Sequence, residues 1–151
     1  MKAKFVTENL NYLNDIKYFS ILYHGTTLNR SIKIKRNGFS LKTQSEKSNY
    51  GSTLGISLTS DYNIAKEHAE WAVEKFKGEE FILEIFSSTL KILKGNIFAK
   101  LDNNYVQAFN LYEKGLIDGV ELYDEQTGDN CEEFEVFIFN IDKLNTLVYQ
   151  N

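Results

Sequence analysis

The chain has 151 residues, enough for one domain with a hydrophobic core and too few for two. Its hydrophobic content of 42% and charged content of 25% are ordinary for a soluble globular protein. A net charge of −4 is a poor basis for tight non-specific binding of nucleic acid, although it leaves a nucleic acid open as a transient substrate.

The sequence also bears on the compartment. Its one cysteine, Cys131, excludes an internal disulfide and is typical of a reducing compartment. The chain has no recognisable cleavable signal and no apolar run long enough to cross a membrane. We therefore expect a cytoplasmic protein without a membrane partner, or one delivered as an effector by a route that the sequence does not show.

The predicted elements alternate along the chain. Apolar residues at roughly helical spacing predict an amphipathic helical segment at 4–19. Strands are predicted at 20–23, 54–59, 80–86, 119–123 and 134–139, with a mixed stretch at 91–98, an exposed turn at 124–130 and a closing edge segment at 142–149. Helices are predicted at 28–37, from a Ser60-Asp61 cap to about Phe76, and at 105–114. Several strands and few helices indicate an α+β fold in a single domain, 1–151, with a helical segment at 1–20.

Three of these strands carry polar or acidic residues of the kinds found in catalytic or binding sites. One strand ends in His24-Gly25-Thr26, and another, Gly55-Ile-Ser-Leu-Thr59, runs directly into a helix. The third begins at Glu135, and Glu133 lies two residues earlier, so both carboxylates share one face at the rim of the sheet. They either lie beside a group that a negative charge would stabilise, or they are solvated carboxylates of an edge strand.

Together with Gly115-Leu-Ile-Asp-Gly-Val120, these motifs resemble the ADP-ribosyltransferase fold of poly(ADP-ribose) polymerases and bacterial ADP-ribosylating toxins. The resemblance covers about residues 22–144. It implies split central, antiparallel-rich sheets flanked by a few helices. It also implies NAD as co-substrate, no metal, and a macromolecular acceptor as partner.

The resemblance assigns roles to individual residues. Glu135 matches the catalytic glutamate, which stabilises the cation left on the ribose when nicotinamide departs. His24 matches the histidine that binds the adenosine ribose. Gly25 lets the nicotinamide carboxamide approach closely, and Thr26 supports that contact. Ser57 stands where polymerase-like members carry tyrosine and toxin-like members serine or threonine, so the chain is similar to a mixed His-Ser-Glu type.

Further positions follow from the same resemblance. Thr59 is a second hydroxyl on the face of Ser57. His68 and Tyr62 compete for the place of the aromatic side chain that stacks on nicotinamide. Glu133, in Glu-x-Glu, accompanies transfer to arginine in toxin-like relatives, because a carboxylate binds a guanidinium with two hydrogen bonds.

The resemblance therefore implies a mono-ADP-ribosyltransferase acting on protein arginine or a nucleic-acid base. The small size of the chain is typical of a bacterial or phage effector, or of a toxin in a toxin–antitoxin or phage-defence system with a cognate antitoxin. Two alternatives stay open. One is an enzyme similar to the RNA 2′-phosphotransferases, and the other is a non-catalytic module that binds NAD or ADP-ribose.

Overall fold

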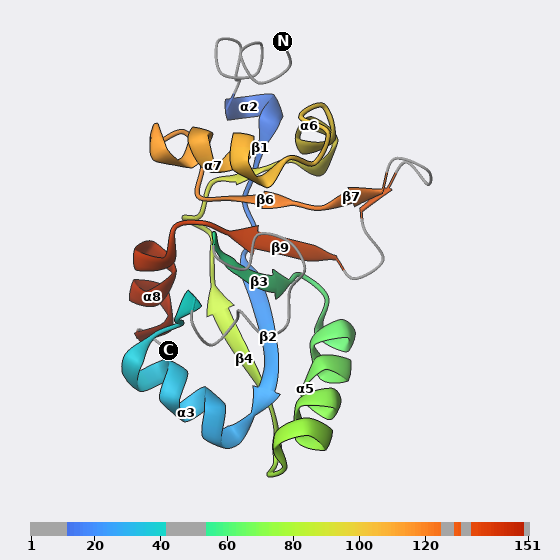
Figure 1. Ribbon diagram of the computed structural model, residues 1–151, viewed down its shortest axis with the longest axis vertical. Helices are drawn as coiled ribbons and strands as arrows, with labels where there is room; N and C mark the ends of the chain where they lie inside the picture. The colour runs from blue at the N-terminus through green and yellow to red at the C-terminus, as the bar shows by residue number, and fades with distance from the viewer. Residues whose placement is uncertain (1–11, 42–53, 125–128, 131–133, 150–151) are drawn as a thin grey trace.

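The computed structural model describes residues 12–41, 54–124, 129–130 and 134–149 (Figure 1). Its strands are β1 (Ile16–Lys17), β2 (Ile21–Thr27), β3 (Ile56–Thr59), β4 (Glu80–Phe86), β5 (Ile92–Leu93), β6 (Gly119–Glu121), β7 (Tyr123–Asp124), β8 (Asp129–Asn130) and β9 (Glu135–Ile138). Its helices are α2 (Tyr12–Asp15), α3 (Leu28–Asn37), α5 (Tyr62–Phe76), α6 (Gly95–Ala99), α7 (Tyr105–Glu113) and α8 (Ile141–Tyr149).

Seven of these strands form one sheet in the order β1-β5-β6-β9-β3-β2-β4, and β7 pairs with β8 separately. All neighbours in the sheet are antiparallel except β5 and β6. The predicted α+β class is confirmed at this level, but the central strands belong to one sheet rather than to split sheets. Its two halves are joined by a single residue pair, Tyr23 with Thr59, and β9 lies crosswise to β2 and β4 in Figure 1.

Helices cover both faces of this curled sheet. On one side, α3 and α8 enclose a buried core, and on the other α6 and α7 cover the part of the sheet around β6 and β9 (Figure 1). The first core contains Leu22, Phe39, Ile56, Leu58, Leu83, Ile85, Leu90, Ile92, Val136, Ile138, Leu144 and Val148. The second contains Ile16, Leu93, Ile97, Phe98, Leu101, Ala108, Leu111, Ile117, Val120, Phe137 and Phe139. Because β9 alternates Val136 and Ile138 with Phe137, it contributes to both cores.

Side chains at or just after the ends of two strands start the helices that follow. Thr27 ends β2 and caps α3, and its Oγ1 accepts a hydrogen bond from the Arg30 amide at 3.2 Å. Asp61 follows β3 and caps α5, and its Oδ1 accepts a hydrogen bond from the Ile64 amide at 3.0 Å. These caps determine where α3 and α5 begin.

Two predicted segments were assigned wrongly. The closing edge segment at 142–149 is helix α8, capped by Asn140, whose Oδ1 accepts from the Lys143 amide at 3.1 Å. Leu144 and Val148 are fully buried four residues apart, which is helical rather than strand spacing. Within the predicted helical segment 4–19, residues 16–17 form β1 instead, because they pair with β5.

The turn in Gly115-Leu-Ile-Asp-Gly-Val120 holds the strands around it in place through Asp118. This carboxylate is buried, and it accepts hydrogen bonds from the Lys91 amide at 2.8 Å, from Asn140 Nδ2 at 2.8 Å and from Lys143 Nζ at 3.1 Å. The Asp118 carbonyl also accepts from the Phe139 amide at 2.9 Å. The turn therefore ties the start of β6 to the end of β9 and the start of α8.

Candidate functional site

Ser57 and Glu135 are in direct contact although 78 residues separate them in the sequence. They lie on the adjacent central strands β3 and β9, and Ser57 Oγ donates a hydrogen bond to Glu135 Oε2 at 2.6 Å. Ser57 is exposed and Glu135 is half-buried. An O–H donor to a carboxylate is a strong, charge-assisted hydrogen bond, so it fixes the orientation of the Glu135 side chain.

Thr59 lies on the same face as this pair. It is opposite Glu135 in the ladder between β3 and β9, and paired residues point their side chains to the same side of a sheet. Thr59 is buried, and its Oγ1 accepts a hydrogen bond from the Asp61 amide at 3.1 Å, just before α5 begins. The structure therefore brings the two predicted hydroxyls and the predicted catalytic carboxylate together on one face.

Tyr62, at the start of α5, joins this face through a second tyrosine. Tyr23 on β2 pairs with Thr59, and the rings of Tyr23 and Tyr62 meet edge to face with centroids 5.6 Å apart. Tyr62 remains 50% exposed, so its ring is accessible to a ligand. An exposed aromatic ring is a suitable surface for a flat heterocycle.

Two of the remaining predicted residues, His24 and Thr26, lie on the other face of β2. His24 alternates with Tyr23, so its side chain lies on the opposite face, where its ring meets the Phe39 ring edge to face at 5.1 Å. Thr26 shares that face and is buried. The structure therefore does not place the imidazole of His24 beside the pair formed by Ser57 and Glu135.

Gly25 faces helix α5 at a distance that only glycine allows. A Cβ atom at this position would lie 1.8 Å from the Ala65 carbonyl oxygen and 2.8 Å from the Ala69 amide nitrogen. Two fully buried alanines thus bring the backbone of α5 directly onto β2. Packing therefore requires glycine at this position, independently of its predicted role in binding nicotinamide.

The backbone of Gly25 nevertheless points along the sheet toward β3. At the two ends of the ladder between β2 and β4, the Leu28 amide donates to the Glu79 carbonyl at 2.9 Å and the Ser87 amide donates to the Ser20 carbonyl at 3.1 Å. Since hydrogen-bonded pairs alternate in an antiparallel ladder, the even-numbered residues of β2 bond to β4.

It follows that the odd-numbered residues of β2 direct their N–H and C=O groups away from β4. Tyr23 meets Thr59 of β3 there, but β3 ends at that pair. Within the ranges that the structure describes, no strand pairs with this side of Gly25. Its amide and carbonyl therefore form a donor–acceptor edge next to the face that carries Ser57 and Glu135.

His68 lies six residues after Tyr62 on α5, next to an aromatic side chain. Its ring is half-buried and lies 5.4 Å from the ring of Trp71, tilted by 38°. Trp71 is 55% exposed and was not predicted as a site residue. The available signal was its spacing, because residues three apart on a helix are neighbours.

The start of β9 is held by main-chain contacts on both sides. Phe134 precedes Glu135 with a φ of 49°, an unusual conformation for a bulky residue. Its carbonyl accepts from the Ser60 amide at 3.1 Å, and the Glu135 carbonyl accepts from the Leu122 amide at 3.0 Å. These contacts determine where the Glu135 side chain emerges. Glu133 lies outside the described residues.

Two further findings concern the described residues. Among the described residues, no group of three or more histidine, cysteine, aspartate or glutamate side chains has the arrangement of a metal site. In the same part of the chain, no helix combines the length and the apolar character needed to span a membrane.

Comparisons with known proteins add no family to this description. No protein-family model, no curated protein and no solved structure matches the chain.

Proposed function

We propose that the chain is a mono-ADP-ribosyltransferase that takes ADP-ribose from NAD. The observation that carries the proposal is the hydrogen bond between Ser57 and Glu135, which orients a half-buried carboxylate on a central strand. The outward-facing amide and carbonyl of Gly25 support it, because a carboxamide such as that of nicotinamide needs one acceptor and one donor.

The reaction breaks the C–N bond between ribose and nicotinamide. Nicotinamide leaves as a neutral molecule with the bonding electron pair, and the ribose carbon develops positive charge. A carboxylate that is already fixed beside this carbon stabilises the cation without reorganising, and Glu135 has this role. The nucleophilic group of the acceptor then forms the new bond to the ribose carbon and loses its proton.

Ser57 is a positioning residue in this scheme. Its hydroxyl donates to Oε2 of Glu135 and so fixes the carboxylate in one orientation toward the ribose. Tyr62 and the pair of rings formed by His68 and Trp71 are the described aromatic groups of α5 that we assign to the nicotinamide side of the site. His24 has no assigned role in bond cleavage, because it lies on the other face of β2.

The acceptor is a protein arginine or a nucleic-acid base, and the experiment below separates the two. Purified protein is incubated with NAD labelled in the adenylate part and with cell lysate treated with either RNase and DNase or protease. Loss of label from one treated lysate identifies the acceptor class. Nicotinamide release is measured in parallel.

We expect Glu135→Gln to lower nicotinamide release by about 10²–10³-fold, the usual effect of removing one preorganised electrostatic group. Ser57→Ala should lower it by about tenfold, because it removes one hydrogen bond to the charged group. Glu113→Gln, at an exposed position of α7, is the matched control and should leave release unchanged.

Two results would contradict the proposal. Equal activity of Glu135→Gln and wild type would point instead to a chemistry that does not use this carboxylate, such as 2′-phosphate transfer. NAD binding without any nicotinamide release from either protein would identify a binding module.

A further inference from the structure

Strand β4 ends the sheet on the side away from the candidate site. Its one neighbour among the described strands is β2, with which it pairs over all seven residues. The end contacts of that ladder show that odd-numbered residues of β4 bond to β2. The even-numbered residues, including Glu80, Ile82 and Phe86, therefore direct their amides and carbonyls outward along the edge.

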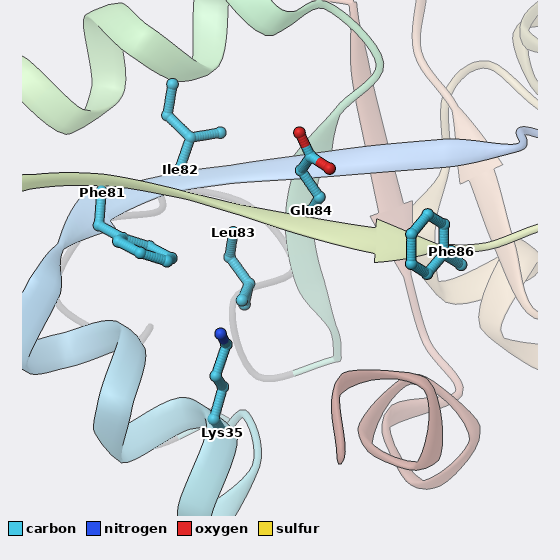
Figure 2. Close-up of a pocket in the computed structure, with 6 residues that line it drawn as sticks. All are labelled: Lys35, Phe81, Ile82, Leu83, Glu84 and Phe86. Carbon is cyan, nitrogen blue, oxygen red and sulfur yellow. The ribbon is translucent and has the colours of Figure 1, made fainter. Parts of the chain in front are cut away.

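A groove follows this edge (Figure 2). Its volume is about 280 Å³, and its lining consists of Lys35, Phe81, Ile82, Leu83, Glu84 and Phe86. This is below the roughly 300–1,000 Å³ of pockets for drug-sized ligands. A groove of this size beside a row of outward-facing main-chain groups fits an extended peptide segment, which makes hydrogen bonds at each second residue.

The two sides of the edge carry opposite charges. Figure 2 shows Ile82 on the side of α5, whereas Leu83 points toward Lys35 on α3. Glu80 is exposed and lies two residues before Ile82 in β4, so its carboxylate is on the α5 side. Lys35 is exposed, and its Nζ lies 5.3 Å from the Phe81 ring. An extended segment bound here would therefore present basic side chains to the α5 side and carboxylates to the α3 side, because strand side chains alternate.

A second copy of this chain is a poor occupant. Pairing β4 with β4 of another molecule in an antiparallel ladder would place the carboxylates of Glu80 and Glu84 from both copies on one face. Like charges at neighbouring positions of paired strands are destabilising. Charged residues on an edge strand generally oppose such self-association.

We infer that the outer edge of β4 binds an extended segment of another protein, which adds to the sheet as a strand. Main-chain hydrogen bonds to Glu80, Ile82 and Phe86 hold the segment. Its specificity comes from alternating basic and acidic side chains that match Glu80 on one face and Lys35 on the other. This inference does not depend on the proposed enzymatic activity.

The test uses fluorescent nine-residue peptides and the full chain. The first peptide carries lysine and valine on one face of the extended chain and aspartate and valine on the other. The second has lysine in place of each aspartate. Fluorescence anisotropy gives the affinities, and we expect wild type to bind the first peptide at least about tenfold more tightly than the second.

Two substitutions locate the binding. Ile82→Pro removes an outward-facing amide without removing a hydrogen bond to β2, and should weaken binding of the first peptide by about tenfold or more. Ile82→Thr keeps the amide and strand propensity, so it controls for the lost side chain and should bind more tightly than the proline variant. Lys35→Glu, at an exposed helical position, should reverse the preference to the second peptide.

Four results would overturn the inference. Equal binding by Ile82→Pro and wild type would show that the edge is not used, and so would absence of binding at millimolar peptide. An unchanged preference in Lys35→Glu would remove the argument from charge. Self-association of wild type that is lost in Ile82→Pro would assign the edge to a second copy.

Discussion

Asp118 offers the most direct measure of what holds β9, and with it Glu135, in position. Three donors converge on its carboxylate, from the Lys91 amide, Asn140 Nδ2 and Lys143 Nζ. Asp118→Asn replaces one acceptor oxygen by an NH₂ group, which must then face one of these donors. The amide of Asn140 cannot simply turn over to compensate, because its Oδ1 already caps α8.

The expected cost is one hydrogen bond to a charged group, roughly 1.5–3 kcal/mol, together with the desolvation of a donor left without a partner. We therefore expect the free energy of unfolding to fall by about 3 kcal/mol. For a chain of this length that corresponds to a decrease in Tm of about 6–12 °C. Urea unfolding followed by circular dichroism measures the change.

Lys143→Met removes the ion pair with Asp118 together with the hydrogen bond that Lys143 Nζ donates to the Thr89 carbonyl at 2.8 Å. The Lys143 side chain is 33% exposed, so water screens its ion pair with Asp118, and we expect a loss of only about 1 kcal/mol. A loss below about 1 kcal/mol for Asp118→Asn would refute the reasoning. If the losses in the free energy of unfolding simply add in the double variant, the coupling between Asp118 and Lys143 is refuted.

Two further substitutions test contacts that shape the site. Gly25→Ala should lower the free energy of unfolding by about 1–3 kcal/mol, because its Cβ would overlap the Ala65 carbonyl and force α5 away from β2; an unchanged urea midpoint would contradict this. Glu121→Gln should cost about 1 kcal/mol, since it loses the ion pair with the 41%-exposed Lys17 but can keep the 3.0 Å hydrogen bond from the Gly95 amide. Thermal unfolding should show Glu121→Ala to be clearly worse, and equal melting temperatures for the two variants would contradict the role of that hydrogen bond.

Local features of the sequence predicted local structure. The caps Thr27 and Asp61 are short polar side chains placed before helical patterns, and each makes the expected hydrogen bond three residues on. Helix α8 was missed, although Leu144 and Val148 have helical spacing, because nine residues give a weak periodic signal and no glycine or proline marks the boundary.

The order of the strands in the sheet decides which residues meet at the site, and no local sequence pattern reveals that order. Ser57 and Glu135 meet because β3 and β9 are neighbours, and their contact spans 78 residues of sequence. The resemblance assigns His24 to the adenosine ribose, and its place in β2 puts its side chain on the face opposite to Ser57 and Glu135. A shift of one residue along a strand exchanges the two faces, so adjacency in a motif does not imply adjacency in a site.

Strand β2 connects the two regions for which we propose a role. The main-chain groups of its even-numbered residues bond to β4, and those of its odd-numbered residues point toward the site. A peptide added to β4 and a ligand beside Gly25 would therefore lie on opposite sides of β2, with β4 between β2 and the peptide. The outer edge of β4 is about 15 Å from β9, three strand spacings away. A bound segment therefore does not cover Ser57 or Glu135. Because α5 packs directly onto β2 at Gly25, any displacement of β2 by such a segment would reach the site through that contact.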